Sequence, residues 1–160
     1  MIRMKYLIFS DLDGTFLNRN TYSTGNLKTF IKKLDIQFEI IFASSKTYEE
    51  IVRIMDLLEI NFPFIVENGA CIFFPKNYLD KKKINRYLFK YKNHLGLKIT
   101  KFDSEKIITI TEYLKKKYRF SFYNDLSDNK IMKITNLKKN EVILSKSRKF
   151  SNPLFWEDSE

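Results

Sequence analysis

Two carboxylates stand two residues apart just after a short apolar run near the start of the chain. Residues 9–15 read FSDLDGT, and the run YLIF at 6–9 precedes Asp11 and Asp13. A spacing of two keeps both side chains on one side of an extended chain. Asp11 could then attack phosphorus as a nucleophile and form an aspartyl-phosphate, while Asp13 protonates the leaving oxygen and afterwards activates water.

The rest of this motif suits an anion. Gly14 permits a sharp turn, which brings backbone N–H groups towards a phosphate, and Thr15 adds a hydroxyl beside it. Mg²⁺ held by Asp11 and Asp13 would let two carboxylates face a phosphate dianion, because hard oxygen ligands suit this ion. The main alternative is a calcium loop of the EF-hand type. That loop needs a third acidic residue and a glutamate at its twelfth position, and asparagines follow here instead.

A second polar segment follows the next apolar run. Residues 39–47 read EIIFASSKT. A small hydroxyl beside a helix N-terminus suits a phosphate oxygen, which makes Ser44 a candidate ligand, and Lys46 could add a charge-assisted contact. The alternative is that these hydroxyls only cap the following helix, and Thr47 has the capping-box spacing to Glu50.

Apolar periodicity predicts alternating strands and helices over residues 1–75. We expect strands at 6–9, 39–43 and 64–66, helices at 23–34 and 47–58, and a hairpin made by a turn at 67–70 and a strand at 71–74. This order implies an α/β fold with a parallel sheet and right-handed crossovers. Active-site loops gather at the carboxyl ends of such strands, where both polar segments lie.

After residue 75 the pattern becomes that of a smaller α+β module. We expect helices around 84–95, 104–118, 128–136 and 139–148, and strands at 97–102, 120–123 and 153–157. The sequence therefore predicts two domains, a core at 1–80 and a second domain at 81–160.

Composition narrows the classes of partner. Basic residues outnumber acidic ones by 29 to 19, a formal charge of +10 that suits nucleic acid, an anionic membrane or phosphorylated metabolites. The lysines are scattered, and the runs at 81–83 and 115–117 are interpreted as solvated faces, so we expect no nucleic-acid partner. No apolar run approaches the length of a membrane span, and a lone cysteine, Cys71, favours the reducing cytoplasm.

Five segments together resemble the mannosyl-3-phosphoglycerate phosphatases of the haloacid-dehalogenase superfamily. Beside the strand and DLDGT, they are FASSKT at 42–47, PFIVENGA at 63–70, YNDLS at 123–127 and RKFSNPL at 148–154. The resemblance implies a partial Rossmann-like core with an α+β cap of the C2 type. It also implies Mg²⁺-dependent release of phosphate from the sugar-glycerate ester 2-O-mannosyl-3-phosphoglycerate, which yields mannosylglycerate.

The same resemblance assigns two further residues. It implies that Asn68 lies near the substrate and that Arg148, on the cap, meets the glycerate carboxylate or the phosphate, since a guanidinium fork matches either anion. A solvated charge at a helix end is the alternative for Arg148. Asn152 departs from the pattern, because an acidic residue is expected before this proline, and that leaves the sugar open. Glucosyl-3-phosphoglycerate and sucrose phosphate are the nearest alternative substrates.

The superfamily also uses a lysine and a glycine-aspartate segment after the cap. The sequence has four glycines and none beyond Gly96, while Asp125 and Asp128 lie in a cap segment and are rejected as substitutes. We therefore expect a truncated or split phosphatase with little activity alone, whose first strand is an exposed apolar edge. A separately encoded C-terminal half is the expected partner, and a non-catalytic module that binds a sugar phosphate or a protein is the alternative.

Overall fold

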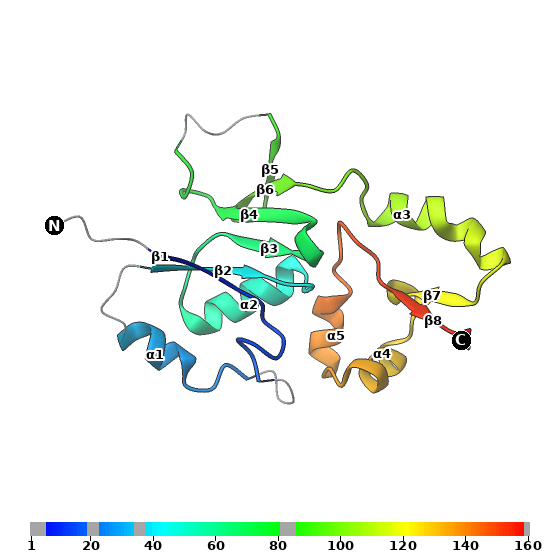
Figure 1. The fold of residues 1–160 in the computed structure, drawn as a ribbon, viewed down its shortest axis with the longest axis horizontal. Coiled ribbons are helices and arrows are strands. Elements are labelled where there is room, and N and C mark those ends of the chain that lie inside the picture. Colours follow the sequence, from blue (N-terminus) through cyan, green and yellow to red (C-terminus); the bar gives the residue numbers. More distant parts are fainter. Residues whose placement is uncertain (1–5, 19–22, 34–37, 81–85, 159–160) are drawn as a thin grey trace.

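A computed structural model describes residues 6–18, 23–33, 38–80 and 86–158. A sheet with helices α1 and α2 forms one part of the molecule, and helices α3 to α5 with two short strands form the other (Figure 1). The α/β class predicted from the sequence is confirmed.

A six-stranded mixed sheet organises the first part. Its strands are β1 (Tyr6–Ser10), β2 (Phe38–Ala43), β3 (Phe64–Val66), β4 (Cys71–Pro75), β5 (Leu88–Tyr91) and β6 (His94–Lys98), in the order β1-β2-β3-β4-β6-β5. The strands β1, β2 and β3 run parallel, as predicted, and β4 returns antiparallel to β3. Because Ser10 pairs with Phe42, the segments that follow β1 and β2 leave the same edge of the sheet.

The helix predicted around 84–95 is wrong. Its described residues form a hairpin of β5 and β6, which extends the sheet beyond β4, and Ile84 lies outside the described residues. The leucines and the tyrosine on which the helix prediction rested can also lie in two paired strands. Lys92, at φ 49°, makes the tight turn between these strands. Gly96 leaves room for the ring of Phe89, a cross-strand contact that no local pattern reveals. The strand predicted at 97–102 accordingly starts earlier and ends at Lys98.

The second part follows the expected order. It contains α3 (Ser104–Thr111), a 3₁₀ turn (Glu112–Lys116), β7 (Phe120–Phe122), a second 3₁₀ turn (Tyr123–Asp125), α4 (Asp128–Thr135), α5 (Lys139–Ser145) and β8 (Leu154–Trp156). Asp103 caps α3, since its carboxylate accepts the N–H of Lys106. The strands β7 and β8 pair antiparallel. The division into a core at 1–80 and a cap at 81–160 stays a prediction, and the first sheet itself runs on to Lys98.

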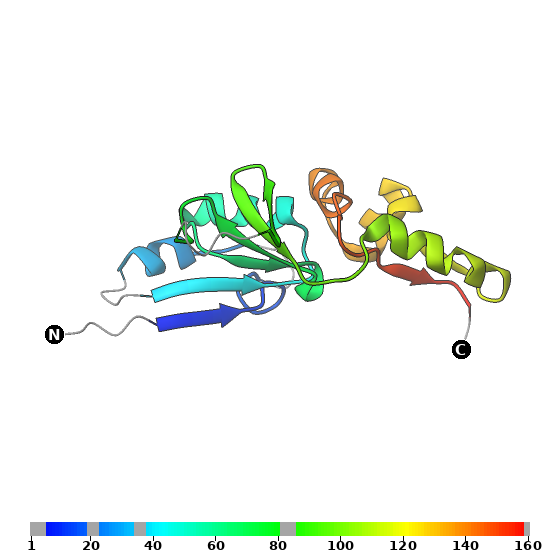
Figure 2. The same cartoon turned by 90° about the horizontal axis from the view of Figure 1, so that it is seen from above.

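The main core lies between the sheet and the helices on one of its faces. The helices α1 (Leu27–Lys33) and α2 (Tyr48–Leu58) both lie on the same side of the sheet (Figure 2). Ile51, Met55 and Leu58 of α2 are buried against phenylalanines of β2 and β3. The helix α1 falls within the segment predicted at 23–34. Among the described residues, no helix has the length and apolar character needed to cross a lipid bilayer.

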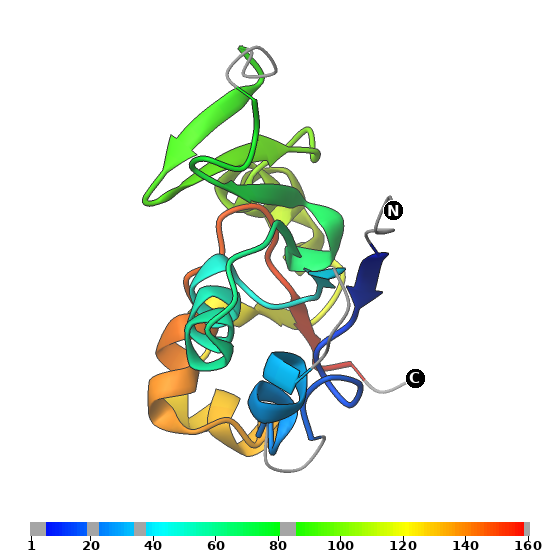
Figure 3. The same ribbon diagram turned by 90° about the vertical axis from the view of Figure 1, so that its left-hand side faces the viewer.

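Strand β1 lies at one edge of this sheet (Figure 3), and β5 lies at the other. Its apolar side chains are largely exposed, with 46% for Tyr6, 58% for Leu7, 40% for Ile8 and 65% for Phe9. Among the described residues β1 pairs with β2 alone. The predicted exposed apolar edge is thus confirmed, and such an edge is a template for pairing with another chain.

His94 gives the fold a pH dependence. Burial lowers the pKa of its imidazole from the ordinary value of 6.5, and Nδ1 lies 2.7 Å from the Tyr48 hydroxyl. Since the unfolded chain binds the proton more readily, this contribution to stability is present above about pH 6.5 and is lost as the pH falls below it. We expect the urea midpoint of the native chain to fall between pH 7.5 and 5.5 by more than that of His94→Gln. Equal falls would contradict this.

Candidate active site

The two aspartates of the first motif lie together at the carboxyl end of β1. They line one cleft of about 450 Å³ with the segment 43–45, Ile65 and the turn residues Asn68 and Gly69. The side chain of Leu12, between them, is completely buried in the core. Leu12 packs into the core while the residues on either side of it line the cleft, so both aspartates face the same space. The structure therefore brings the two carboxylates into one cleft.

The turn after the aspartates closes on itself. Gly14 adopts φ 73°, a conformation that favours glycine, and the N–H groups of Phe16 and Leu17 donate to the carbonyl of Leu12 at 3.1 and 2.7 Å. The chain therefore turns back on itself, and the side chain of Leu17 is buried. Gly14 and Thr15 line a separate hollow, so the structure does not bring them into the aspartate cleft.

The loop after β2 and the turn after β3 form the opposite wall of the cleft. The N–H of Ser44 donates to the carbonyl of Ile65 at 3.1 Å, and the carbonyl of Ser44 accepts the N–H of Asn68 at 3.0 Å. Asn68, at φ 61°, and Gly69, at φ 88°, are both left-handed. Ser44 and Asn68 therefore line the same cleft as the two aspartates.

Lys46 serves as a counter-ion inside the site. Its ammonium is buried, lying 3.0 Å from Asp13 Oδ1 and 3.6 Å from Glu50 Oε1. Glu50 in turn belongs to the predicted capping box: its carboxylate accepts the Thr47 N–H at 2.9 Å, and Thr47 Oγ1 accepts the Glu50 N–H. The cap fixes the first turn of α2 and thereby places Lys46 against Asp13.

Arg148 reaches the same loop from the second part of the molecule. Its Nη2 donates to the carbonyl of Ser45 and to Oγ of Ser151, each at 2.9 Å. It lines a second cleft, of about 210 Å³, together with Asp13 and Lys46. Asp13 is common to both clefts, so the carboxylate pair, the lysine and the arginine form one continuous site.

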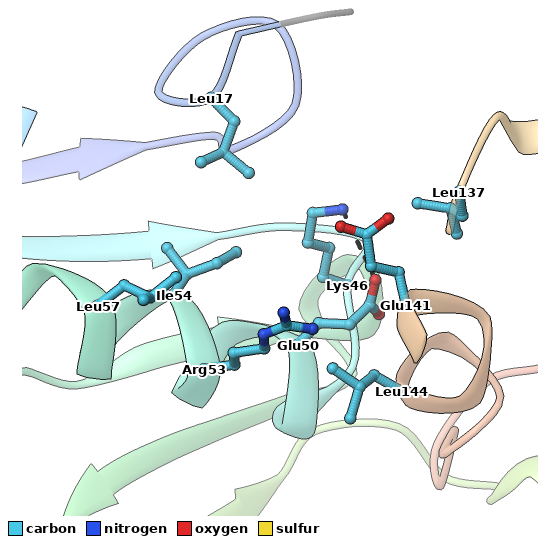
Figure 4. A pocket seen from close by; sticks show the side chains of 9 residues that line it. All are labelled: Leu17, Lys46, Glu50, Arg53, Ile54, Leu57, Leu137, Glu141 and Leu144. Atoms are coloured by element: carbon cyan, nitrogen blue, oxygen red, sulfur yellow. Dashed lines mark ion pairs between the residues drawn. The ribbon is translucent and has the colours of Figure 1, made fainter. Parts of the chain in front are cut away.

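A smaller pocket of about 100 Å³ adjoins this site between α2 and α5. Lys46 and Glu50 form its inner wall, Arg53 and Glu141 lie beside them, and leucines and an isoleucine supply the apolar remainder (Figure 4). The site thus continues into a pocket with both charged and apolar walls.

Glu67 is the residue that sequence reasoning missed. It follows β3, is 2% exposed, and its carboxylate accepts three backbone N–H groups from the segment next to Arg148. The available signal was an acidic residue directly after the apolar strand Phe64–Val66, where burial demands partners. Those partners lie more than 80 residues away.

The residues present fit Mg²⁺ only in part. Asp11 offers a carboxylate in the cleft, whereas the carboxylate of Asp13 is already paired with Lys46. Within the ranges that the structure describes, no group of three or more histidine, cysteine or acidic side chains gathers. Since Mg²⁺ takes about six oxygen ligands in octahedral geometry, further donors would have to complete its site.

Comparison with known proteins identifies the family to which the chain belongs. Residues 8–155 match the haloacid dehalogenase-like hydrolases, and the chain belongs to this family. The protein TM0651 of Thermotoga maritima has the same fold, with a TM-score of 0.51, 20% identity, and 90% of this chain and 53% of that chain covered.

More specific similarity points to sugar phosphoglycerate phosphatases. The chain is 32% identical to the glucosyl-3-phosphoglycerate/mannosyl-3-phosphoglycerate phosphatase of Persephonella marina, over 96% of this chain and 56% of that protein. It is 34% identical to the mannosyl-3-phosphoglycerate phosphatase of Pyrococcus furiosus, over 98% of this chain and 62% of that protein. The resemblance stated from the sequence is confirmed. It spans less than two thirds of each relative.

Proposed function

We propose that this chain carries the nucleophile of a phosphatase that acts on a phosphorylated sugar-glycerate ester. One observation carries the proposal: Asp11 and Asp13 share a cleft with Ser44 and Asn68 at the carboxyl end of β1. The names of the relatives support the substrate class. Because the first of them is named for both sugars, we propose mannosyl- and glucosyl-3-phosphoglycerate together as candidate substrates.

The chemistry follows from the two carboxylates. An Asp11 oxygen attacks phosphorus, the bond from phosphorus to the leaving oxygen breaks, and Asp13 gives that oxygen its proton. Water then attacks the aspartyl-phosphate, with Asp13 taking the water's proton, and phosphate leaves. The Ser44 hydroxyl would donate to a phosphate oxygen, while Lys46 offsets negative charge beside Asp13.

Mg²⁺ is the proposed cofactor. The Asp11 carboxylate and the backbone carbonyl of Asp13 would supply two of its ligands, which leaves the Asp13 carboxyl for proton transfer, and further oxygen donors would complete the site. When bound, the ion offsets the negative charge of the phosphate and of the carboxylate that attacks it.

Arg148 is proposed to bind the anionic end of the substrate. Its guanidinium lies at the Ser45 carbonyl, in the cleft that Asp13 also lines. A planar fork of N–H donors matches a carboxylate or a phosphate at two points.

A further α/β segment is the proposed partner, either joined to this chain or encoded separately. The exposed apolar side chains of β1 supply its docking edge, and the relatives' greater length supplies a candidate. We propose the cytoplasm as the compartment of this chain, since Cys71 is a buried free thiol. Burial raises the pKa of this thiol to about 12.

Phosphate release tests the proposal. We expect the chain alone, with Mg²⁺ and either sugar phosphoglycerate, to turn over far more slowly than about one per second, an ordinary rate for an enzyme. Adding the part of the Persephonella marina phosphatase that lies outside the matched region should raise the rate at least about a hundredfold. A turnover near one per second by the chain alone would contradict the need for a partner. No release by the mixture from either substrate would contradict the assigned function.

A further inference from the structure

The buried carboxylate of Glu67 joins the two parts of the molecule. Its Oε1 accepts the N–H of Lys149 at 2.9 Å, and its Oε2 accepts the N–H groups of Phe150 and Ser151 at 3.0 and 2.8 Å. The hydroxyl of Ser151 also donates to Oε2, at 2.8 Å. Four donors on one buried carboxylate make this a specific binding site for a backbone segment.

The backbone of Glu67 is hydrogen-bonded to the loop between β2 and α2. Its N–H donates to the carbonyl of Lys46 at 3.0 Å, and the next N–H, of Asn68, donates to the carbonyl of Ser44. Glu67 adopts φ 50°, which is unfavourable for a residue with a Cβ atom, so these contacts must hold it there. One residue thus contacts the β2–α2 loop through its backbone and the segment 149–151 through its side chain.

The side chain of Arg148 is oriented by the same contacts. Its Nε lies 3.9 Å from Glu67 Oε2, and both Nε and Nη2 donate to Oγ of Ser151, at 3.2 and 2.9 Å. Because Glu67 holds Ser151, it also determines where the guanidinium meets the carbonyl of Ser45.

The segment that joins the sheet to the second part and the loop between α5 and β8 meet at this turn. The N–H of Ile99, after β6, donates to the carbonyl of Ala70, and the N–H of Ser104 donates to the carbonyl of Lys149. The segments from β6 to α3 and from α5 to β8 therefore come together beside Glu67, near the ends of β3 and β4 (Figure 1). A change at Glu67 acts where the second part joins the sheet.

We propose that Glu67 is a positioning residue, which fixes the segment 148–151 against the loop between β2 and α2 and so holds Arg148 where it binds the anionic end of the substrate. The first half of this statement is independent of the proposed function, and the second half rests on it. Glu67 itself lies behind the guanidinium and needs no contact with substrate.

Amide hydrogen exchange of the chain tests the positioning. In Glu67→Gln, which keeps the shape but loses the charge, we expect exchange at Lys149, Phe150 and Ser151 to rise at least about tenfold. Amides of β2 and α2 should keep their rates. The matched control is Glu112→Gln, an exposed glutamate paired with Lys115. Unchanged exchange at the three amides, or an equal rise throughout the chain, would overturn the positioning role.

Inorganic phosphate serves as the probe for the second half. In the native chain we expect the Nε–H resonance of Arg148 to shift as phosphate is added, and the half-saturating concentration to rise about tenfold in Glu67→Gln. Ser151→Ala, which leaves the charges in place, should raise it less. If the Arg148 resonance did not shift when phosphate is added, or if all variants had the same half-saturating concentration, the proposed role of Arg148 in binding the substrate would be overturned. This outcome is distinct from a failure of catalysis, because no turnover is measured.

Discussion

Phosphate release should fall by at least about a thousandfold when Asp11 is replaced by asparagine, since loss of a covalent nucleophile removes a whole reaction path. The asparagine side chain has the same shape, and Asp11 is exposed at the cleft, so the fold should persist. The measurement is single-turnover phosphate release from mannosyl-3-phosphoglycerate, with Mg²⁺ and the complementing segment of the Persephonella marina phosphatase. Acid quenching with labelled substrate should trap phosphate on the native chain and none on Asp11→Asn.

The control for this variant is Asp125→Asn. Asp125 is an exposed carboxylate 3.8 Å from Lys115 in the second part of the molecule, outside both clefts. Its replacement should leave release unchanged. If Asp11→Asn kept more than about a tenth of the native rate, Asp11 would not be the nucleophile. A drop of about 100- to 10,000-fold in Asp13→Asn would fit its separate role in proton transfer.

Lysines placed on β1 should weaken binding of the complementing segment about a hundredfold. Leu7 and Phe9 are two residues apart, hence on one face of the strand, and both are more than half exposed. Burying the two side chains would contribute about 3 kcal/mol, and each 1.4 kcal/mol is a factor of ten in affinity. The measurement is titration calorimetry of the double variant Leu7→Lys, Phe9→Lys with the segment.

The same variant should lower self-association of the chain alone, seen by sedimentation velocity, because charged residues protect an open strand edge. Phe30→Lys is the matched control: Phe30 is also largely exposed but belongs to α1, a helix that lies on one face of the sheet (Figure 2). It should leave both affinity and self-association near native values. Equal effects of the double variant and of Phe30→Lys would show that β1 is not the docking edge.

Much of the fold could be predicted because it depends on neighbours in sequence. Alternation of apolar strands and amphipathic helices predicted β1 to β4 and α2, and the capping box of Thr47 with Glu50 is present as its spacing required. The geometry of the DLDGT motif could be predicted for the same reason. Leu12 is buried between the two aspartates that line the cleft, and Gly14 adopts a left-handed conformation. These features are set by interactions within a few residues.

The sequence by itself thus determined the family, the succession of β1 to β4 along the chain and the carboxylate pair, because each depends on residues that are close together in sequence. Tertiary structure alone decided that residues 88–98 form a hairpin on β4, that Lys46 pairs with Asp13, and that Thr15 lies outside the cleft. It also decided the burial of Glu67 under a segment more than 80 residues away. Such contacts depend on which surfaces meet after the chain has folded, and no local periodicity encodes that meeting.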